Sequence, residues 1–168
     1  TTDWSRVGTG FLLLQKECSC KKPKGEKALT KCCKDGWKLI LAGGKYNTPA
    51  ETRYAPIEGE LLAIATALHK CRYFIYGAED LTLITDHKPL VNYLSKLTIA
   101  EEENRRMTNL KRRCENFDFN IKYEIGSSNG ADVISRREPQ NADDSANEDW
   151  DPKLEDMDRA ELVEVLCS

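Results

Sequence analysis

Apolar positions follow two different periods along the first 136 residues. Short apolar runs, several of them partly alternating with polar residues, occupy residues 1–4, 8–15, 37–42, 81–86 and 118–123, which predicts five β-strands. Gly43 and Gly44 are expected to end the third strand. From Ile57 to Gly77 the period changes to that of a helix, with one apolar stripe formed by Ile57, Leu61, Ile64, Ala65, Leu68 and Cys71.

Three shorter helices complete the predicted order of elements. They are expected from Pro89 to about Ser95, over residues 101–116, and from Asp132 to Arg137. The order is therefore β-β-β-α-β-α-α-β-α. Three strands in an antiparallel meander followed by helix-linked strands predict an α/β fold, with a five-stranded mixed sheet and helices on its faces.

The polar segments divide the chain into one domain and a tail. Residues 1–136 form the predicted domain, interrupted at 16–36 by an insertion rich in Lys and Cys. Residues 137–152 resemble an acidic linker, and residues 153–168 could form an amphipathic helix that docks on the domain or a partner, or else stays exposed. A length of 168 residues fits this division.

Charge is distributed unevenly between these parts. Residues 1–136 carry 22 Lys and Arg against 17 Asp and Glu, whereas residues 137–168 carry 3 against 11. A basic domain suits a nucleic-acid partner, although an ordinary surface with a disordered end explains the charge equally well. No apolar run approaches the roughly 20 residues of a membrane span, and no signal peptide is evident, so we expect no membrane partner.

Four acids occur at the ends of predicted elements. Asp3 lies in the first strand, Asp86 closes the fourth, and Glu60 and Asp132 lie at the starts of helices. A sheet that brought these carboxylates together would create a cluster that divalent cations neutralise, and Mg²⁺ prefers such oxygen ligands. Periodicity alone does not distinguish Glu60 from Glu58, because they flank the apolar stripe at similar angles.

Several strings occur in a characteristic order. They are Arg53–Ile64 with Gly59-Glu60-Leu61-Leu62, then Thr85-Asp86-His87-Lys88-Pro89-Leu90, then Asn116–Tyr123, then Gly130-Ala131-Asp132-Val133-Ile134-Ser135-Arg136. In this order they resemble the RNase H domain of a gypsy-type LTR-retrotransposon reverse transcriptase, over about residues 1–136. Residues 137–168 do not share the resemblance.

The resemblance implies an endoribonuclease that cuts the RNA strand of RNA·DNA hybrids during reverse transcription. It implies two Mg²⁺ ions, replaceable by Mn²⁺, held by the catalytic residues Asp3, Glu60, Asp86 and Asp132. A polymerase domain of the same polyprotein is the implied partner, and the implied location is intracellular, in the cytoplasm and in virus-like particles. The chain lacks an initiator Met and begins close to Asp3, so we expect a segment of a longer polyprotein whose first strand is cut close.

Two alternative functions stay open. One is a catalytically silent or domesticated RNase H-like domain that binds hybrid nucleic acid or a partner protein, and the four intact acids argue against it. The other is a nuclease of the same fold that cuts DNA. Glu60 on the long helix and the string from Thr85 to Pro89 favour RNase H over that second alternative.

A repeated group of cations marks the helix over residues 101–116. Its two clusters are seven residues apart and therefore lie on the same faces of a helix: Arg105, Arg106, Lys111, Arg112 and Arg113. We expect these side chains to contact the phosphates of a hybrid recognised by its shape and 2′-hydroxyls. A merely solvated helical face is the alternative.

Seven cysteines, an odd number without signs of secretion, predict reduced thiols and no disulfide framework. Cys18, Cys20, Cys32 and Cys33 lie within sixteen residues of the insertion and could hold one structural Zn²⁺. Their spacing is unusual, so free thiols in a lysine-rich loop are the alternative. Cys71 and Cys114 fall on apolar stripes and are expected in the core.

Overall fold

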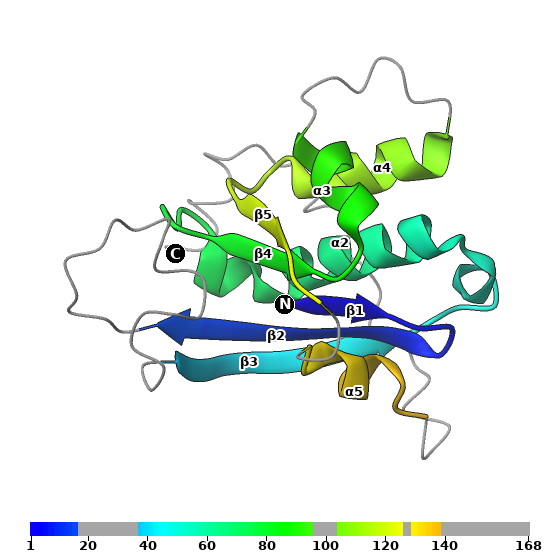
Figure 1. The fold of residues 1–168 in the computed structure, drawn as a ribbon, viewed down its shortest axis with the longest axis horizontal. Coiled ribbons are helices and arrows are strands. Elements are labelled where there is room, and N and C mark those ends of the chain that lie inside the picture. The colour runs from blue at the N-terminus through cyan, green and yellow to red at the C-terminus, as the bar shows by residue number, and fades with distance from the viewer. Residues whose placement is uncertain (17–36, 96–103, 126–128, 139–168) are drawn as a thin grey trace.

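The computed structural model describes residues 1–16, 37–95, 104–125 and 129–138. The elements follow the predicted order (Figure 1), and their bounds are β1 Thr2–Trp4, β2 Gly8–Lys16, β3 Trp37–Tyr46, the 3₁₀ turn η2 Glu51–Arg53, α2 Pro56–Ile75, β4 Thr82–Thr85, α3 Lys88–Ser95, α4 Arg105–Cys114, β5 Asn120–Tyr123 and α5 Ala131–Ser135. The insertion beyond Lys16 and the tail beyond Glu138 lie outside the described residues, so the structure leaves their predicted organisation open.

The strands form two sheets. Strands β1, β2 and β3 pair antiparallel in that order, and β4 pairs parallel with β5. The mixed α/β class is confirmed, but the single five-stranded sheet predicted from the sequence is present as three strands plus two. The reason is the shortness of β1, which pairs with β2 only from Thr2 to Trp4 and therefore runs beside β4 for a short distance.

Helix α2 supplies the centre of the core. The predicted stripe is buried, with Leu61, Ile64 and Leu68 at most 1% exposed. These side chains pack with Phe11 of β2 and Leu83 of β4, so one helix joins the two sheets (Figure 1). Burying each such side chain contributes about 1.5–3 kcal/mol, which makes α2 the main support of the fold.

The two glycines expected to end the third strand instead lie inside it. Strand β3 continues to Tyr46, and Gly43 and Gly44 pair with Phe11 and Gly10. A Cβ at Gly44 would lie 2.1 Å from the Thr9 carbonyl oxygen, and one at Gly43 would press on the Phe11 ring. The glycines therefore permit close packing of the strand and do not end it.

Helix α4 has a well-formed start. The side chain of Asn104 accepts hydrogen bonds from the backbone amides of Arg106 and Met107, as an N-cap residue does. Met107, Leu110 and Cys114 face the core, as the sequence predicts.

No described helix is both long enough and apolar enough to cross a membrane.

Candidate active site

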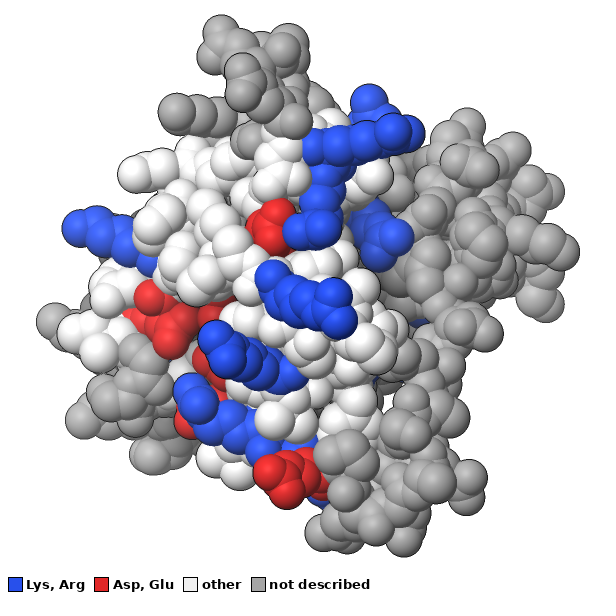
Figure 2. Space-filling view, turned by 90° about the vertical axis from the view of Figure 1, so that its right-hand side faces the viewer, with Lys and Arg blue, Asp and Glu red and all other residues white. Residues whose placement is uncertain are grey.

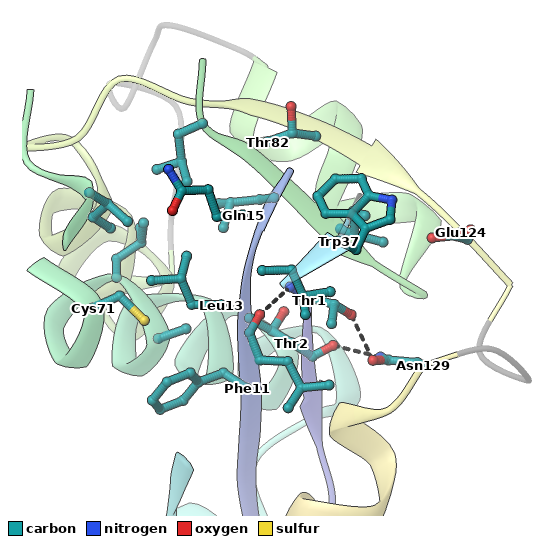
Figure 3. Close-up of a pocket in the computed structure, with 18 of the residues that line it drawn as sticks. Thr1, Thr2, Phe11, Leu13, Gln15, Trp37, Cys71, Thr82, Glu124 and Asn129 are labelled. Carbon is teal, nitrogen blue, oxygen red and sulfur yellow. Dashed lines mark hydrogen bonds between the residues drawn. The ribbon is translucent and has the colours of Figure 1, made fainter. Parts of the chain in front are cut away.

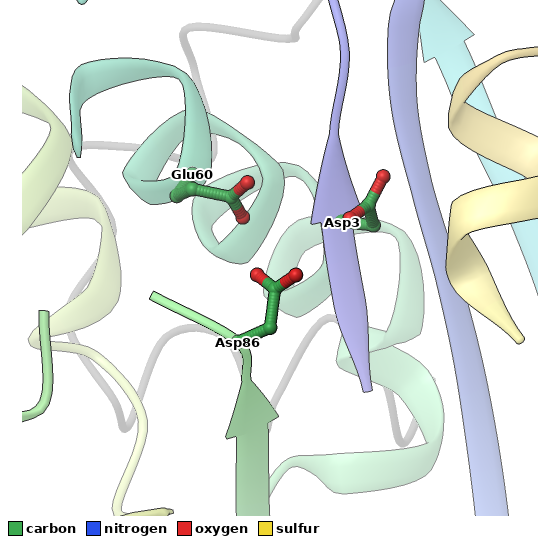
Figure 4. Close-up of side chains that lie close together, drawn as sticks. All are labelled: Asp3, Glu60 and Asp86. Carbon is green, nitrogen blue, oxygen red and sulfur yellow. The ribbon is translucent and has the colours of Figure 1, made fainter. Parts of the chain in front are cut away.

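Three of the four predicted acids come together where β1, α2 and β4 meet (Figure 4). Asp3 lies on β1, Glu60 lies one turn into α2, and Asp86 follows β4 directly. One carboxylate oxygen from each lies within 4.8 Å of the others. The fold therefore gathers acids from a stretch of more than eighty residues of sequence into one cluster.

Burial makes the negatively charged forms of these carboxyl groups unfavourable. Asp3 is 3% exposed and Glu60 is 7% exposed. Burial, with repulsion from Asp3 and Asp86, raises the pKa of Glu60 to about 8. Burial also raises the pKa of Asp3, against the hydrogen bond from Ser135 and with repulsion from Asp132 and Asp86. The cluster is thus a place where positive charge is strongly favoured.

The donor set fits a divalent cation. Atom Oε2 of Glu60 is buried and has no hydrogen-bond partner among the described residues. A buried polar atom without a partner is uncommon and requires an explanation such as a bound ion. Three carboxylates offering oxygen ligands at one point are the ligands that Mg²⁺ and Mn²⁺ prefer.

Neighbouring residues hold Asp3 and Glu60 in place. The fully buried hydroxyl of Ser135 donates to Oδ2 of Asp3, and the backbone amide of Trp4 donates to the carboxyl of Glu60. The Trp4 ring packs directly on Gly59, where a Cβ would lie 2.2 Å from a ring carbon. Strand β1 and helix α2 can approach closely only because position 59 has no side chain.

Asp132 is placed differently from the other predicted acids. It lies in the first turn of α5, and its Oδ1 accepts a hydrogen bond of 2.6 Å from Nε of Arg136. It is close enough to Asp3 for its charge to raise the pKa of that residue. It does not belong to the group of three oxygens within 4.8 Å, so Asp132 lies at the edge of the cluster.

Glu58 points away from this cluster. Its carboxylate accepts hydrogen bonds from Arg106 at 2.9 and 3.0 Å, from the Asn104 side chain and from the Ala55 amide. Burial opposes ionisation, but these hydrogen bonds outweigh it and lower the pKa of Glu58. Glu58 therefore joins the starts of α2 and α4. Periodicity alone did not distinguish Glu58 from Glu60, and in the structure Glu60 is the one that belongs to the cluster.

The five predicted cations of α4 have different surroundings. Arg105 and Arg112 are exposed and Arg113 is partly exposed. Arg106 binds Glu58, and its guanidinium stacks over Tyr54 at 4.3 Å. Lys111 is only 6% exposed, with its amine 5.1 Å from the centre of the Tyr93 ring. Because Lys111 is buried and Arg106 is paired with Glu58, the contacts of these two cations support the fold.

Lys and Arg side chains form a band across one face of the molecule (Figure 2). This face carries the N-terminal ends of α2 and α4, and Asp and Glu side chains lie beside the band (Figures 1 and 2). Basic side chains beside an acidic cluster can hold a phosphate backbone against bound cations.

The cysteines divide between described and undescribed parts of the chain. Cys18, Cys20, Cys32 and Cys33 lie outside the described residues, so the zinc hypothesis remains a prediction. Cys71 and Cys114 are buried in the core, as predicted. Burial raises the pKa of the Cys71 thiol to about 11 and that of Cys114 to about 12, so both are chemically quiet.

Trp4, Gly59 and Ser135 support the acids, but the sequence pattern alone does not mark them for this role. Trp4 and Gly59 lie next to acids in the sequence, which is a weak signal for their contact across elements. Ser135 follows Asp132 by three residues, yet its hydroxyl contacts Asp3, which lies at the other end of the domain's sequence. Only the packing of α5 on β1 and β2 brings these residues together.

Comparison with known protein families is consistent with this geometry. Residues 1–117 match the family model described as the RNase H-like domain found in reverse transcriptase. The match covers β1 to α4 and therefore includes Asp3, Glu60 and Asp86.

Curated relatives are polyproteins of transposons. The chain is 34% identical over 139 residues, 82% of its length, to the retrovirus-related Pol polyprotein from transposon gypsy of Drosophila melanogaster. It is 37% identical over 91 residues, 54% of its length, to the Pol polyprotein from transposon opus of the same species. A third relative is the Tf2-3 polyprotein of Schizosaccharomyces pombe, 32% identical over 52% of the chain. The aligned regions cover only 11%, 9% and 6% of these polyproteins.

Proposed function

Because the chain belongs to the family of RNase H-like domains found in reverse transcriptase, we propose that it is a ribonuclease H that hydrolyses the RNA strand of RNA·DNA hybrids. The observation that carries this proposal is the cluster of Asp3, Glu60 and Asp86, buried at the meeting point of three elements. Its proposed setting is reverse transcription, with a polymerase domain in the same polyprotein, as the transposon relatives suggest.

The proposed cofactor is a pair of Mg²⁺ ions. Asp3, Glu60 and Asp86 would hold them, with Asp132 as a further ligand at the edge of the cluster. When bound, Mg²⁺ acts as a Lewis acid for the phosphate and makes water a stronger nucleophile near neutral pH. Without Mg²⁺, Glu60 with a pKa of about 8 is mostly protonated at neutral pH.

The chain's own residues position the reacting groups. Ser135 fixes one oxygen of Asp3, and the Trp4 amide fixes the carboxyl of Glu60, so both acids are oriented before substrate arrives. Arg136 competes with any cation for Asp132, since it already donates to Oδ1. The exposed arginines Arg105 and Arg112 are proposed to contact phosphates of the hybrid.

The experiment is a cleavage assay with Mg²⁺ on labelled RNA·DNA hybrid, double-stranded RNA and double-stranded DNA. We expect cleavage of the RNA strand of the hybrid only. Cleavage of DNA would favour a nuclease of other specificity, and hybrid binding without cleavage would favour the catalytically silent domain.

The same assay tests the acids. Asp86→Asn should reduce cleavage to a few per cent or less while hybrid binding is retained, because it removes a metal ligand and leaves the basic face unchanged. Asp118→Asn, at an exposed acid outside the cluster, is the matched control and should keep full activity. Substantial cleavage by Asp86→Asn would contradict the proposed site.

A further inference from the structure

Helix α5 carries Asp132 but has little that would hold it in place by itself. It spans only five residues, Ala131–Ser135, and isolated helices shorter than roughly 12 residues are marginal in water. Its buried residues are Ala131 and Ser135, and Val133 is 76% exposed. The place of Asp132 in the fold therefore depends on the contacts that attach α5 to its neighbours.

One such contact is made directly with the backbone of β2. A Cβ at Gly10 would lie 2.4 Å from the carbonyl oxygen of Ala131 and 2.7 Å from the amide nitrogen of Ser135. Gly10 is also the residue of β2 that pairs with Asp3 of β1. Because Gly10 has no side chain, α5 can approach the two strands at the level of Asp3.

Asn129 attaches the start of α5 to the first residues of the chain (Figure 3). Its Nδ2 donates to the carbonyl oxygen of Thr2 at 2.8 Å, and its Oδ1 accepts from the hydroxyl of Thr1 at 2.6 Å. The same Oδ1 accepts from the backbone amide of Ala131 at 3.1 Å, and the Asn129 carbonyl oxygen accepts from the amide of Asp132 at 3.1 Å. One residue therefore both starts the helix and ties it to β1.

Ser135 attaches the end of α5 to the same strand and to the turn that follows it. Its hydroxyl donates to Oδ2 of Asp3, and its carbonyl oxygen accepts from the hydroxyl of Ser5 at 2.5 Å. The Ser5 oxygen also accepts from two backbone amides of the turn between β1 and β2, at 3.1 and 3.2 Å. Ser5 and Ser135 are both buried, so water competes little for these hydrogen bonds. Asp132 thus lies between two attachments of α5 to β1.

We propose that Asn129 is a positioning residue for the metal site, because it holds Asp132 beside Asp3 through the attachment of α5 to β1. Its side-chain hydrogen bonds end on the chain around the start of β1 and on α5 itself, so its effect on a cation passes through the helix. Arg136 cannot do this, since it donates to Asp132 from the end of the same helix. The inference rests on the proposed metal-dependent function.

The test measures Mn²⁺ binding to the 168-residue protein without nucleic acid, through the electron paramagnetic resonance signal of free Mn²⁺. Asn129→Ala should raise the Kd for Mn²⁺ roughly tenfold, the usual size of effect when a residue that orients a metal ligand is removed. Asn129→Ser is the second variant. It keeps an oxygen that can accept from the Ala131 amide but removes the donor to Thr2, so its Kd should also rise.

A double-mutant cycle tests whether the effect passes through Asp132. In the Asp132→Asn background, Asn129→Ala should change the Kd by about twofold or less. Asn104→Ala is the matched control. Asn104 accepts from the amide two residues ahead at 3.0 Å and donates to Glu58 at 2.9 Å, so it starts α4 and ties it to α2 as Asn129 does for α5 and β1. This control should lower Tm but leave the Kd for Mn²⁺ within about twofold of the parent.

Several results would overturn the inference: no Mn²⁺ binding by the parent, an unchanged Kd in Asn129→Ala, or the same loss with and without Asp132. An equal loss in Asn104→Ala would do so too, because reduced stability alone would then explain the effect. Hybrid cleavage, measured on the same parent protein, separates this inference from the proposed function. Mn²⁺ binding that follows the cycle in a protein that cleaves no hybrid would support the positioning role of Asn129 and contradict the ribonuclease.

Discussion

At the scale of single residues, the acidic cluster combines two opposing demands. Metal binding requires carboxylates close together, whereas folding without metal requires that few of them be charged. The structure meets both demands through Glu60, whose pKa is raised by burial and by repulsion from Asp3 and Asp86. A proton can therefore occupy the place of a cation when none is bound.

This arrangement predicts how stability depends on pH in the presence of a chelator. The folded-state pKa of Glu60, about 8, exceeds the ordinary value of 4.5, so its stabilising contribution is complete below pH 4.5 and is lost as pH rises through 8. The loss can approach about 1.4 kcal/mol per pH unit in this window. Denaturant unfolding with EDTA, followed at several pH values, measures the slope.

Two comparisons identify Glu60 as the source of that slope. Glu60→Gln should flatten it between pH 5 and 8, whereas Glu115→Gln, at an exposed acid, should leave it unchanged. Adding Mg²⁺ should stabilise the protein more at pH 8 than at pH 5, because at pH 8 fewer protons must leave the acidic cluster when the ion binds. A slope that persists undiminished in Glu60→Gln would show that another group, such as Asp3 with its raised pKa, accounts for it.

At the scale of elements, the contact between β1 and α2 determines the distance between Asp3 and Glu60. Gly59 gives no room for a side chain, since the Trp4 ring lies where a Cβ would be. In most helices Ala is more favourable than Gly by about 1 kcal/mol, so propensity alone predicts that Gly59→Ala stabilises the protein.

We predict the opposite sign for Gly59→Ala. The methyl group would push β1 from α2, at a cost of roughly 1–3 kcal/mol, and would separate the acids. Both the free energy of unfolding and the rate of hybrid cleavage should fall. Ala65→Gly, at a buried position on another face of the same helix, is the control, because it should lose stability away from the contact with Trp4. A more stable Gly59→Ala variant would show that β1 adapts easily.

Helix α4 provides a second test at this scale. Replacing exposed Arg105 and Arg112 with Ala should weaken hybrid binding and flatten its dependence on salt by about one to two units of slope. Replacing Lys38 and Lys122, which lie on β3 and β5, gives a variant of equal charge change and should leave the slope close to that of the parent. An unchanged slope in the α4 variant would mark these arginines as a solvated face.

Arg106→Ala separates structural from substrate contacts on the same helix. It leaves the buried Glu58 without its cation, so it should lower stability, unlike Arg105→Ala. Equal stability of the two single variants would mean that the Glu58 ion pair contributes little to the fold.

Strong local patterns allowed the elements, but not all their ends, to be predicted. The long apolar stripe around Leu61 and Leu68 leads to α2 without ambiguity, because many positions repeat the same period. The strand end predicted at Gly43 and Gly44 was wrong, because the sequence does not distinguish a glycine that permits close packing from one that ends a strand. Local pattern also cannot show that β1 is too short to join two sheets.

The site shows the same division between local and long-range information. Four acids at element ends could be recognised from the sequence. The helical period alone, however, did not show whether Glu58 or Glu60 belongs to the site. Their difference arises from Arg106 and Asn104 on one side and from Asp3 and Asp86 on the other, all distant in sequence. The ion pair of Asp132 with Arg136 was equally invisible, although the two residues are one helical turn apart.

At the scale of the whole molecule, cysteines occur both in the described domain and in the insertion. Of the seven, Cys71 and Cys114 are buried with raised pKa values and should not react with a thiol reagent under native conditions. The remaining five are Cys18, Cys20, Cys32, Cys33 and Cys167. The first four lie in the insertion, so their reactivity reports on its state, whereas Cys167 lies in the tail.

The zinc hypothesis predicts one zinc per chain in protein purified without chelator, with the four thiols of the insertion protected from a thiol reagent. A free lysine-rich loop predicts no zinc and four freely reacting thiols in the insertion. Cys32→Ser should lower stability in the first case and leave it unchanged in the second, while cleavage of the hybrid by the acidic cluster continues in both. Elemental analysis with native thiol titration makes the decision, and free titration of all four insertion thiols without zinc would end the zinc hypothesis.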